Sequence, residues 1–255
     1  MLTDKAGNVL TVRNVESFVF ADGARPLDDL QYNLVSPGND KLYGSADNDT
    51  INGQAGADTM TGYGGDDTYI VDNAGDQIVE GDGEGIDHVQ VALSAAGTYT
   101  LADFVENGTV TSAAGVAVNL NGNWLDNVLT GNAAANTLNG GDGHDTLDGG
   151  AGNDKLVGGT GDDVYIVADA GDVVVELADE GHDTVRTGLA SYTLAANVED
   201  LRYTGKTAFT GTGNAIANVI SGGDGGARLD GGAGNDTLFG GSGNDTCKAA
   251  WAMMC

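Results

Sequence analysis

Apolar residues recur at every ninth position in three stretches of the chain, and mostly glycine and short polar residues lie between them. From Val35, four consecutive nonapeptides read VSPGNDKLY, GSADNDTIN, GQAGADTMT and GYGGDDTYI. Each has Asp at its sixth position and an apolar residue at its eighth. Five further nonapeptides begin at Gly122 and four at Gly213. A disordered glycine-rich linker does not require this period, so the pattern favours an ordered repeat structure.

The period predicts a turn followed by a short strand in every nonapeptide. Glycines at positions one, two and four allow positive φ angles and a close approach of the backbone to an ion. In the three residues after position six, alternation points the middle, apolar side chain inward. Two such strands wind one coil of 18 residues, and stacked coils form two parallel sheets. We therefore predict an all-β fold, an elongated parallel β-solenoid.

Side chains at position six stack on one another in this arrangement, about 4.8 Å apart. Unscreened carboxylates at that distance repel, and hard cations such as Ca²⁺ prefer oxygen ligands from tight loops. The candidate metal ligands are Asp40, Asp49, Asp58, Asp67, Asn127, Asn136, Asp145, Asp154, Asp163, Asn218, Asp236 and Asp245. A β-helix without metal, in which Asp caps turns through backbone bonds, stays open as an alternative.

The composition of the chain adds one point to this prediction, because it indicates which kinds of partner the chain can bind. The chain has 38 acidic and 10 basic residues, a formal net charge of -28, and 43 glycines in 255 residues. This balance argues against nucleic acid and anionic membrane surfaces, which need a basic face. No apolar run approaches the length of a membrane span, so membrane insertion is not expected. Calcium is the expected partner, in several copies.

Five nonapeptides match the pattern G-G-x-G-x-D-x-U-x almost fully: 140–148, 149–157, 158–166, 231–239 and 240–248. They resemble the hemolysin-type, or RTX, calcium-binding repeat. The resemblance implies an elongated right-handed parallel β-roll with calcium bound in its turns, each ion held between a loop and the loop two nonapeptides later. The implied pairs are Asp40 with Asp58, Asp49 with Asp67, and Asp145 with Asp163, and the weaker pairs are Asn127 with Asp145, Asn136 with Asp154, and Asn218 with Asp236. Ala227 interrupts the pair with Asp245.

The same resemblance implies a secreted bacterial protein that leaves the cell by type I secretion, and the start of the chain has no Sec-type signal peptide. The role expected is a stabilising, adhesion or secretion scaffold. An extracellular protein or polysaccharide is a candidate partner for such a scaffold.

The segments between the arrays are related to each other at an offset of 96 residues. DDTYIV at 66–71 matches DDVYIV at 162–167, and Glu80 matches Glu176. We therefore divide the chain into the tail of a preceding unit (1–34), arrays at 35–71, 122–166 and 213–248, β-rich spacers at 72–121 and 167–212, and an atypical C-terminal tail (249–255). The spacers should continue the two sheets, which gives one solenoid from Leu34 to Lys248.

Carboxylates in the spacers have two interpretations. Asp76, Asp87, Asp172 and Asp183 follow glycine or lie one residue beyond it, which suits either further calcium ligands or turn formers on the surface. The acids at 80 and 176 could pair with Asp76 and Asp172, where they would bind metal or cap a turn.

Two function classes remain open. The first is a non-catalytic module that folds on calcium; the second is a calcium-dependent ester or phosphoester hydrolase with an incompletely coordinated ion. The chain has neither G-x-S-x-G nor H-E-x-x-H. Position five of a repeat places His144 in an exposed loop, while His88 and His182 are out of register between the copies, which disfavours a catalytic role. Hydrolysis of activated esters and phosphoesters, with and without chelator, would discriminate the two classes.

Overall fold

The computed structural model describes residues 2–3, 9–10, 17–20, 23–26 and 35–249. Near the N-terminus, β1 (Leu2–Thr3) pairs antiparallel with β2 (Val9–Leu10), and β3 (Ser17–Phe20) pairs antiparallel with β4 (Gly23–Pro26). Most of the predicted unit tail (1–34) and nearly all of the C-terminal tail (249–255) lie outside the described residues.

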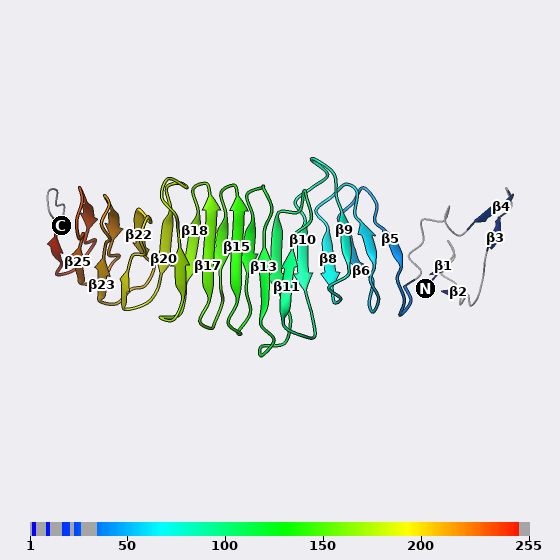
Figure 1. Ribbon diagram of the computed structural model, residues 1–255, viewed down its shortest axis with the longest axis horizontal. Helices are drawn as coiled ribbons and strands as arrows, with labels where there is room; N and C mark the ends of the chain where they lie inside the picture. The colour runs from blue at the N-terminus through cyan, green and yellow to red at the C-terminus, as the bar shows by residue number, and fades with distance from the viewer. Residues whose placement is uncertain (1, 4–8, 11–16, 21–22, 27–34, 250–255) are drawn as a thin grey trace.

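From residue 41 to residue 248 the chain winds as a parallel β-solenoid, and the described residues contain no helix. Figure 1 shows an elongated rod whose strands run across its long axis. The even-numbered strands form one sheet of eleven: β6 (Thr50–Asn52), β8 (Thr68–Val71), β10 (His88–Val91), β12 (Asn107–Val110), β14 (Val128–Thr130), β16 (Thr146–Asp148), β18 (Val164–Val167), β20 (Thr184–Thr187), β22 (Asp200–Tyr203), β24 (Val219–Ser221) and β26 (Thr237–Phe239).

The odd-numbered strands form three smaller sheets, of three, five and four strands. These are β5 (Lys41–Tyr43), β7 (Thr59–Thr61) and β9 (Gln77–Val79); then β11 (Gly97–Thr100), β13 (Val118–Asn121), β15 (Thr137–Asp142), β17 (Lys155–Thr160) and β19 (Val173–Val175); then β21 (Ser191–Thr193), β23 (Phe209–Thr212), β25 (Ala227–Asp230) and β27 (Thr246–Lys248). Every pair between β5 and β27 is parallel, which confirms the predicted fold class.

Strand register follows the nonapeptide period within the arrays. Thr146 pairs with Val164 and Leu138 with Leu156, both 18 residues apart. Coils in the spacers have other lengths, because Thr68 pairs with residue 88, twenty residues later. The sheet of even-numbered strands nevertheless continues through both spacers, since the second and fourth residues of these strands are buried, as alternation requires.

The core is a narrow stack of the residues at position eight. Twelve of the thirteen are at most 3% exposed, and only Cys247 is partly exposed: Leu42, Ile51, Met60, Tyr69, Leu129, Leu138, Leu147, Leu156, Tyr165, Ile220, Leu229 and Leu238. Full burial of such a side chain contributes roughly 1.5–3 kcal/mol. Spacer residues such as Val89, Leu120 and Leu201 join the same core.

One expectation about the spacers needs correction, because only one of the two sheets continues through them. Strand β9 does not pair with β11, and β19 does not pair with β21. Both gaps follow the loops 80–87 and 176–183, which are longer than a nonapeptide loop such as 44–49. The longer loop changes the path of the coil, so the next odd-numbered strand does not reach the previous one. Tyr99 and Tyr192 line the clefts at the two gaps.

Candidate calcium sites

Residues at position six form a ladder along the roll. In each case the backbone N–H of one residue donates to a carboxylate oxygen, Oδ1, of the sixth-position residue 18 positions later. The donor and acceptor residues are Asp40 and Asp58 (2.8 Å), Asp49 and Asp67 (2.7 Å), Asn127 and Asp145 (2.7 Å), Asn136 and Asp154 (2.8 Å), Asp145 and Asp163 (2.8 Å), and Asn218 and Asp236 (3.1 Å). The structure thus brings all six predicted pairs together, while their role as calcium ligands stays a prediction.

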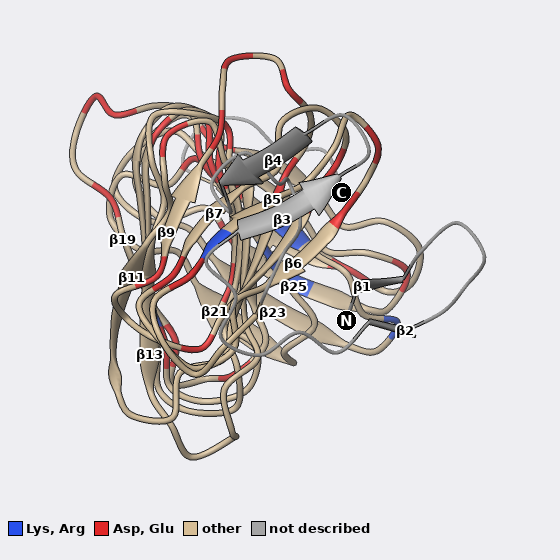
Figure 2. Ribbon diagram, turned by 90° about the vertical axis from the view of Figure 1, so that its right-hand side faces the viewer, with Lys and Arg blue, Asp and Glu red and all other residues tan. Residues whose placement is uncertain are grey.

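The second carboxylate oxygen of these residues has no protein partner. Oδ2 is buried without a hydrogen bond in Asp58, Asp67, Asp145, Asp154, Asp163 and Asp236. A buried ionised carboxylate that lacks a partner is costly, so each of these oxygens requires a proton or a cation. Viewed along the roll, acidic residues gather in the loops, and few Lys or Arg residues accompany them (Figure 2).

Glycine at position one leaves the space beside each free oxygen. A Cβ on Gly140 would overlap Asp145 Oδ2 and lie 2.7 Å from the carbonyl oxygen of Gly158. The space that this glycine leaves is therefore bordered by a carboxylate oxygen and a backbone carbonyl oxygen. Carboxylate and carbonyl oxygens are the ligands that Ca²⁺ takes in flexible loops, so the residues present fit this ion.

Burial changes the acidity of the same groups. It raises the pKa of Asp145 to about 7, although the backbone N–H of Asn127 lowers it. Burial also raises the pKa of Asp163 to about 7 and that of Asp154 to about 6. At neutral pH these carboxylates therefore sit near their titration midpoints, and a bound cation would stabilise the ionised form.

Asparagines at position six use both the oxygen and the nitrogen of their side chains in hydrogen bonds to the backbone. Asn136 accepts the N–H of Asn132 at 2.9 Å and donates to the carbonyl oxygen of Val118 at 2.7 Å. Asn127 and Asn218 make equivalent bonds to the spacer that precedes their array. Coordination of calcium by these amides stays a prediction, and the loops at the start of the second and third arrays hold together through neutral groups.

Candidate ligands near the ends of the roll are less buried. Asp40, Asp49 and Asp245 are all partly exposed. The carboxylate of Asp40 accepts the backbone N–H of Ser36 at 2.6 Å, so it lies within its own loop. Asp245 accepts the backbone N–H of Ala227 at 2.8 Å, and the ladder persists there although residue 227 offers no oxygen from its side chain.

The ladder extends beyond the arrays into both spacers. Asp67 donates its N–H to Asp87 at 2.8 Å, and Asp163 donates to Asp183 at 2.9 Å. Both acceptors are 1% exposed, so they are not turn formers on the surface. Asp76 and Asp172 accept from Asp58 and Asp154 in the same manner.

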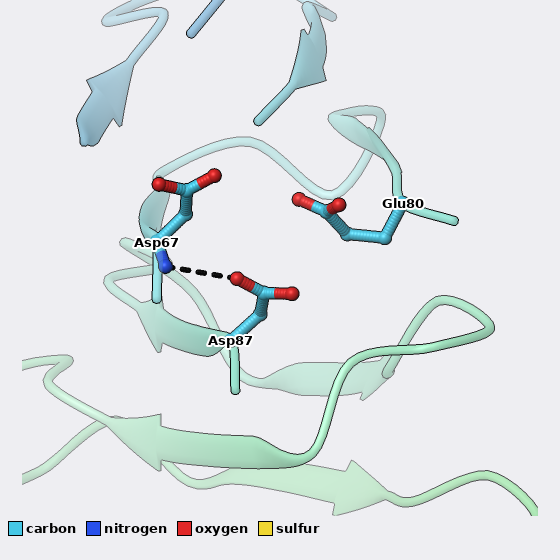
Figure 3. Close-up of side chains that lie close together, drawn as sticks. All are labelled: Asp67, Glu80 and Asp87. Carbon is cyan, nitrogen blue, oxygen red and sulfur yellow. Dashed lines mark hydrogen bonds between the residues drawn. The ribbon is translucent and has the colours of Figure 1, made fainter. Parts of the chain in front are cut away.

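Two glutamates from the longer loops lie beside the ladder, and each forms a group of three carboxylates with two of its aspartates. We name these groups the closing clusters. The first is Asp67, Glu80 and Asp87, and the second is Asp163, Glu176 and Asp183. In each cluster one ligand oxygen per residue lies within 4.8 Å of the others. Figure 3 shows the first cluster, with Glu80 facing Asp67 and Asp87. The sequence suggested partners at 76 and 172 instead. The offset of 96 residues is the signal that singled out both glutamates, but it could not say which acids they meet.

Burial and neighbouring carboxylates together give the closing clusters the most perturbed acids. Burial, with charge repulsion from Asp87 and Asp67, raises the pKa of Glu80 to about 8. The same causes, with Asp183 and Asp163 as neighbours, raise the pKa of Glu176 to about 9. Carboxyl groups with pKa values above 7 need a bound cation if they are to ionise fully at neutral pH.

The histidines contact neighbouring coils. His144 is exposed, as its position in the repeat predicts, and its Nδ1 accepts the backbone N–H of Asp162 at 2.7 Å. His88 Nε2 lies 2.9 Å from the hydroxyl of Thr109, and burial lowers the pKa of this imidazole.

Comparison with protein families supports the assignment of the repeats. The family model described as RTX calcium-binding nonapeptide repeat (4 copies) matches residues 35–69, 121–156, 130–165, 142–175 and 212–247. No curated protein matches the chain. In the described part of the chain, no helix is long and apolar enough to cross a membrane. Nonapeptide repeats, a parallel solenoid and a ladder of acids coincide, and the chain therefore belongs to the hemolysin-type RTX repeat proteins of the parallel β-roll class.

Proposed function

We propose that this chain is an extracellular module that folds when it binds several calcium ions and then serves as a stabilising, adhesion or secretion scaffold. One observation carries the proposal: a row of buried carboxylate oxygens without protein partners, in a chain of net charge -28. Compaction without counterions forces these charges together, so folding and cation binding are coupled.

Calcium acts on the loops in this proposal. An ion beside the glycine at position one would take the free Oδ2 atom of one loop and the carbonyl oxygen of the loop two nonapeptides later. It would neutralise the repulsion and fix the spacing of two coils. Extracellular calcium modules typically have dissociation constants of about 10⁻⁴–10⁻³ M. Such sites fill at the calcium concentration outside the cell and stay empty at the lower concentration in the cytosol. The chain would stay unfolded before export and fold outside the cell, as the family resemblance to type I secreted proteins suggests.

Far-UV circular dichroism during a calcium titration tests the coupling. We expect a largely disordered spectrum in chelator and a β-rich spectrum in millimolar calcium, with the number of bound ions counted by elemental analysis. Magnesium should substitute poorly, because it demands octahedral geometry and keeps its water ligands. Sodium chloride at matched ionic strength controls for simple charge screening. A β-rich spectrum that does not change when chelator is added would refute the proposal.

A further inference from the structure

Each closing cluster brings three carboxylates together, one more than a pair of sixth-position residues supplies, and no described Lys or Arg forms an ion pair with it. Glu176 is only 6% exposed, and neither of its carboxylate oxygens has a hydrogen-bond partner. Oδ2 of Asp163, which is fully buried, also lacks a partner. The ion pairs found in the described residues are His182 with Asp200 and Lys248 with Asp230, and neither involves a cluster.

A buried tyrosine hydroxyl lies against each cluster. A Cβ on Gly62 would overlap Asp67 Oδ2 and the Tyr69 hydroxyl, and would lie 2.5 Å from Glu80 Oε1, so these three oxygens border one small space. Tyr69 is fully buried, and its hydroxyl has no hydrogen-bond partner. The arrangement recurs 96 residues later, where Asp163 Oδ2 and the Tyr165 hydroxyl border the space at Gly158.

A turn cap does not explain the two glutamates. A capping carboxylate accepts backbone N–H groups, as Asp87 does from Asp67. The carboxylates of Glu80 and Glu176 have no well-formed hydrogen bond, and the one backbone contact, from the adjacent Gly81 to Glu80, lowers the pKa of Glu80 less than burial and its acidic neighbours raise it. Both carboxylates instead point into the space that the aspartates share, as Figure 3 shows for the first copy.

The nonapeptide motif does not supply these glutamates. Residues 35–69 and 142–175 match the repeat family, and the matches end before residues 80 and 176. Each glutamate comes from the longer loop that follows an array, at the level of the array's last sixth-position Asp. The clusters are therefore a feature of the junction between array and spacer.

We propose that Glu80 and Glu176 each complete a three-carboxylate cation site that binds calcium more tightly than the nonapeptide loops do, and that these two sites fill first. The inference rests on the calcium-dependent folding proposed above. Three hard anionic oxygens attract a divalent cation more strongly than two, and a trivalent lanthanide more strongly still. A filled site links the last loop of an array to the first coil of the spacer.

Calorimetric titration of the whole chain with calcium tests the site. The variant Glu80→Gln/Glu176→Gln keeps side-chain size and removes both carboxylates. The matched control, Asp82→Asn/Asp179→Asn, removes two exposed charges from the same loops. We expect two of the tightest ions to bind about tenfold or more weakly in the glutamine variant, because ligand charge sets calcium affinity. The control should bind as the original chain does.

Terbium luminescence locates the ion independently, because Tyr69 and Tyr165 lie close enough to excite a lanthanide in the sites. Terbium emission excited through these tyrosines should rise at the first equivalents of terbium. It should be lost in the variant Tyr69→Phe/Tyr165→Phe, while that variant keeps its calcium stoichiometry. Persistent emission in the phenylalanine variant would overturn the proposal. Unchanged stepwise affinities in the glutamine variant would overturn it as well and leave calcium-dependent folding intact. A parent chain that binds no calcium would instead refute the proposed function itself.

Discussion

At the scale of single residues, the sixth-position Asp divides its two oxygens between two tasks. In Asp163, Oδ1 accepts the backbone N–H of Asp145 at 2.8 Å, and Oδ2 is buried without a partner. Its own N–H donates to Asp183 at 2.9 Å. The residue therefore joins three coils, and its substitution removes both a bond between coils and a candidate ligand.

Replacement of Asp163 by Ala should raise the calcium midpoint of folding markedly, because Oδ2 is lost beside Glu176 and Asp183. The same change at Asp245 should have little effect, since that residue is partly exposed and faces Ala227. Calcium titrations followed by circular dichroism measure both midpoints. Equal shifts at the two positions would show that the assignment of ligand pairs is wrong.

Gly140→Ala should also raise the calcium midpoint, although it changes no charge. The added Cβ would fill the space beside Asp145 Oδ2 and crowd the carbonyl oxygen of Gly158. Gly115→Ala is the matched control, because a Cβ at Gly115 meets no atom within 4 Å. The two glycines have ordinary φ angles, so backbone strain should not differ between the variants. A midpoint that is the same in the two variants would show that calcium does not occupy this space.

At the scale of elements, the strands of the arrays were predictable because the nonapeptide period determines which side chain faces inward. Leu138 and Leu156 illustrate this, since both occupy position eight and pair in adjacent coils. The spacers were harder, because their coils do not keep one length. Their β structure was predicted correctly from alternation, but the gaps at β11 and β21 were not.

The candidate sites were likewise predictable only where the nonapeptide period holds. The spacing predicted that each sixth-position residue contacts the residue 18 positions later, and the hydrogen-bond ladder follows this spacing. The partners of Glu80 and Glu176 depend on how an irregular loop turns back over the array, which no period describes. One carboxylate from the array and two from the longer loop meet only in three dimensions.

Acidity should promote folding of the arrays in the absence of calcium. Burial raises the pKa of Glu176 to about 9 and that of Asp163 to about 7, whereas exposed carboxyl groups titrate near 4. The folded chain therefore holds protons that the unfolded chain has released, and stability falls as pH rises from about 4.5 to about 9. In chelator, the β signal should be stronger at pH 5 than at pH 9.

Saturating calcium should remove this dependence on pH, because the ion displaces the protons that the folded chain holds on the same oxygens. The calcium midpoint of folding should decrease as pH falls from about 9 to about 5, because protonated carboxyl groups already stabilise the folded chain. Circular dichroism at a series of pH values measures both trends. If the chain in chelator is at least as folded at pH 9 as at pH 5, then burial does not raise the pKa values of these groups.

At the scale of the whole molecule, the arrays and spacers form one solenoid because the even-numbered strands pair without interruption from β6 to β26. A short array alone exposes apolar side chains at both of its ends, and the adjoining spacer coils cover them. Val89 and Leu120 of the first spacer belong to the same core as Leu129 and Leu138 of the second array.

Small-angle scattering in calcium should therefore show a rod-like particle rather than separate compact units. Limited proteolysis should spare residues 71–121 and 167–212, because their strands are paired within the long sheet. Proteolysis in chelator provides the comparison, since the chain should be cut throughout. Rapid cleavage inside these segments in calcium, with the arrays surviving as fragments, would contradict a continuous solenoid.

The unequal continuity of the two faces has a mechanical consequence. Hydrogen bonds between strands run along the length of the rod, so the eleven-stranded sheet resists stretching throughout, whereas the opposite face has no strand pairing at two levels. At those levels the rod can bend by widening a gap without breaking a backbone hydrogen bond. The intact sheet then lies on the inner side of the curve, and each gap lies near a junction of array and spacer. Under lateral load we expect bending to concentrate at these two gaps, a compliance that a uniform stack of nonapeptides would lack.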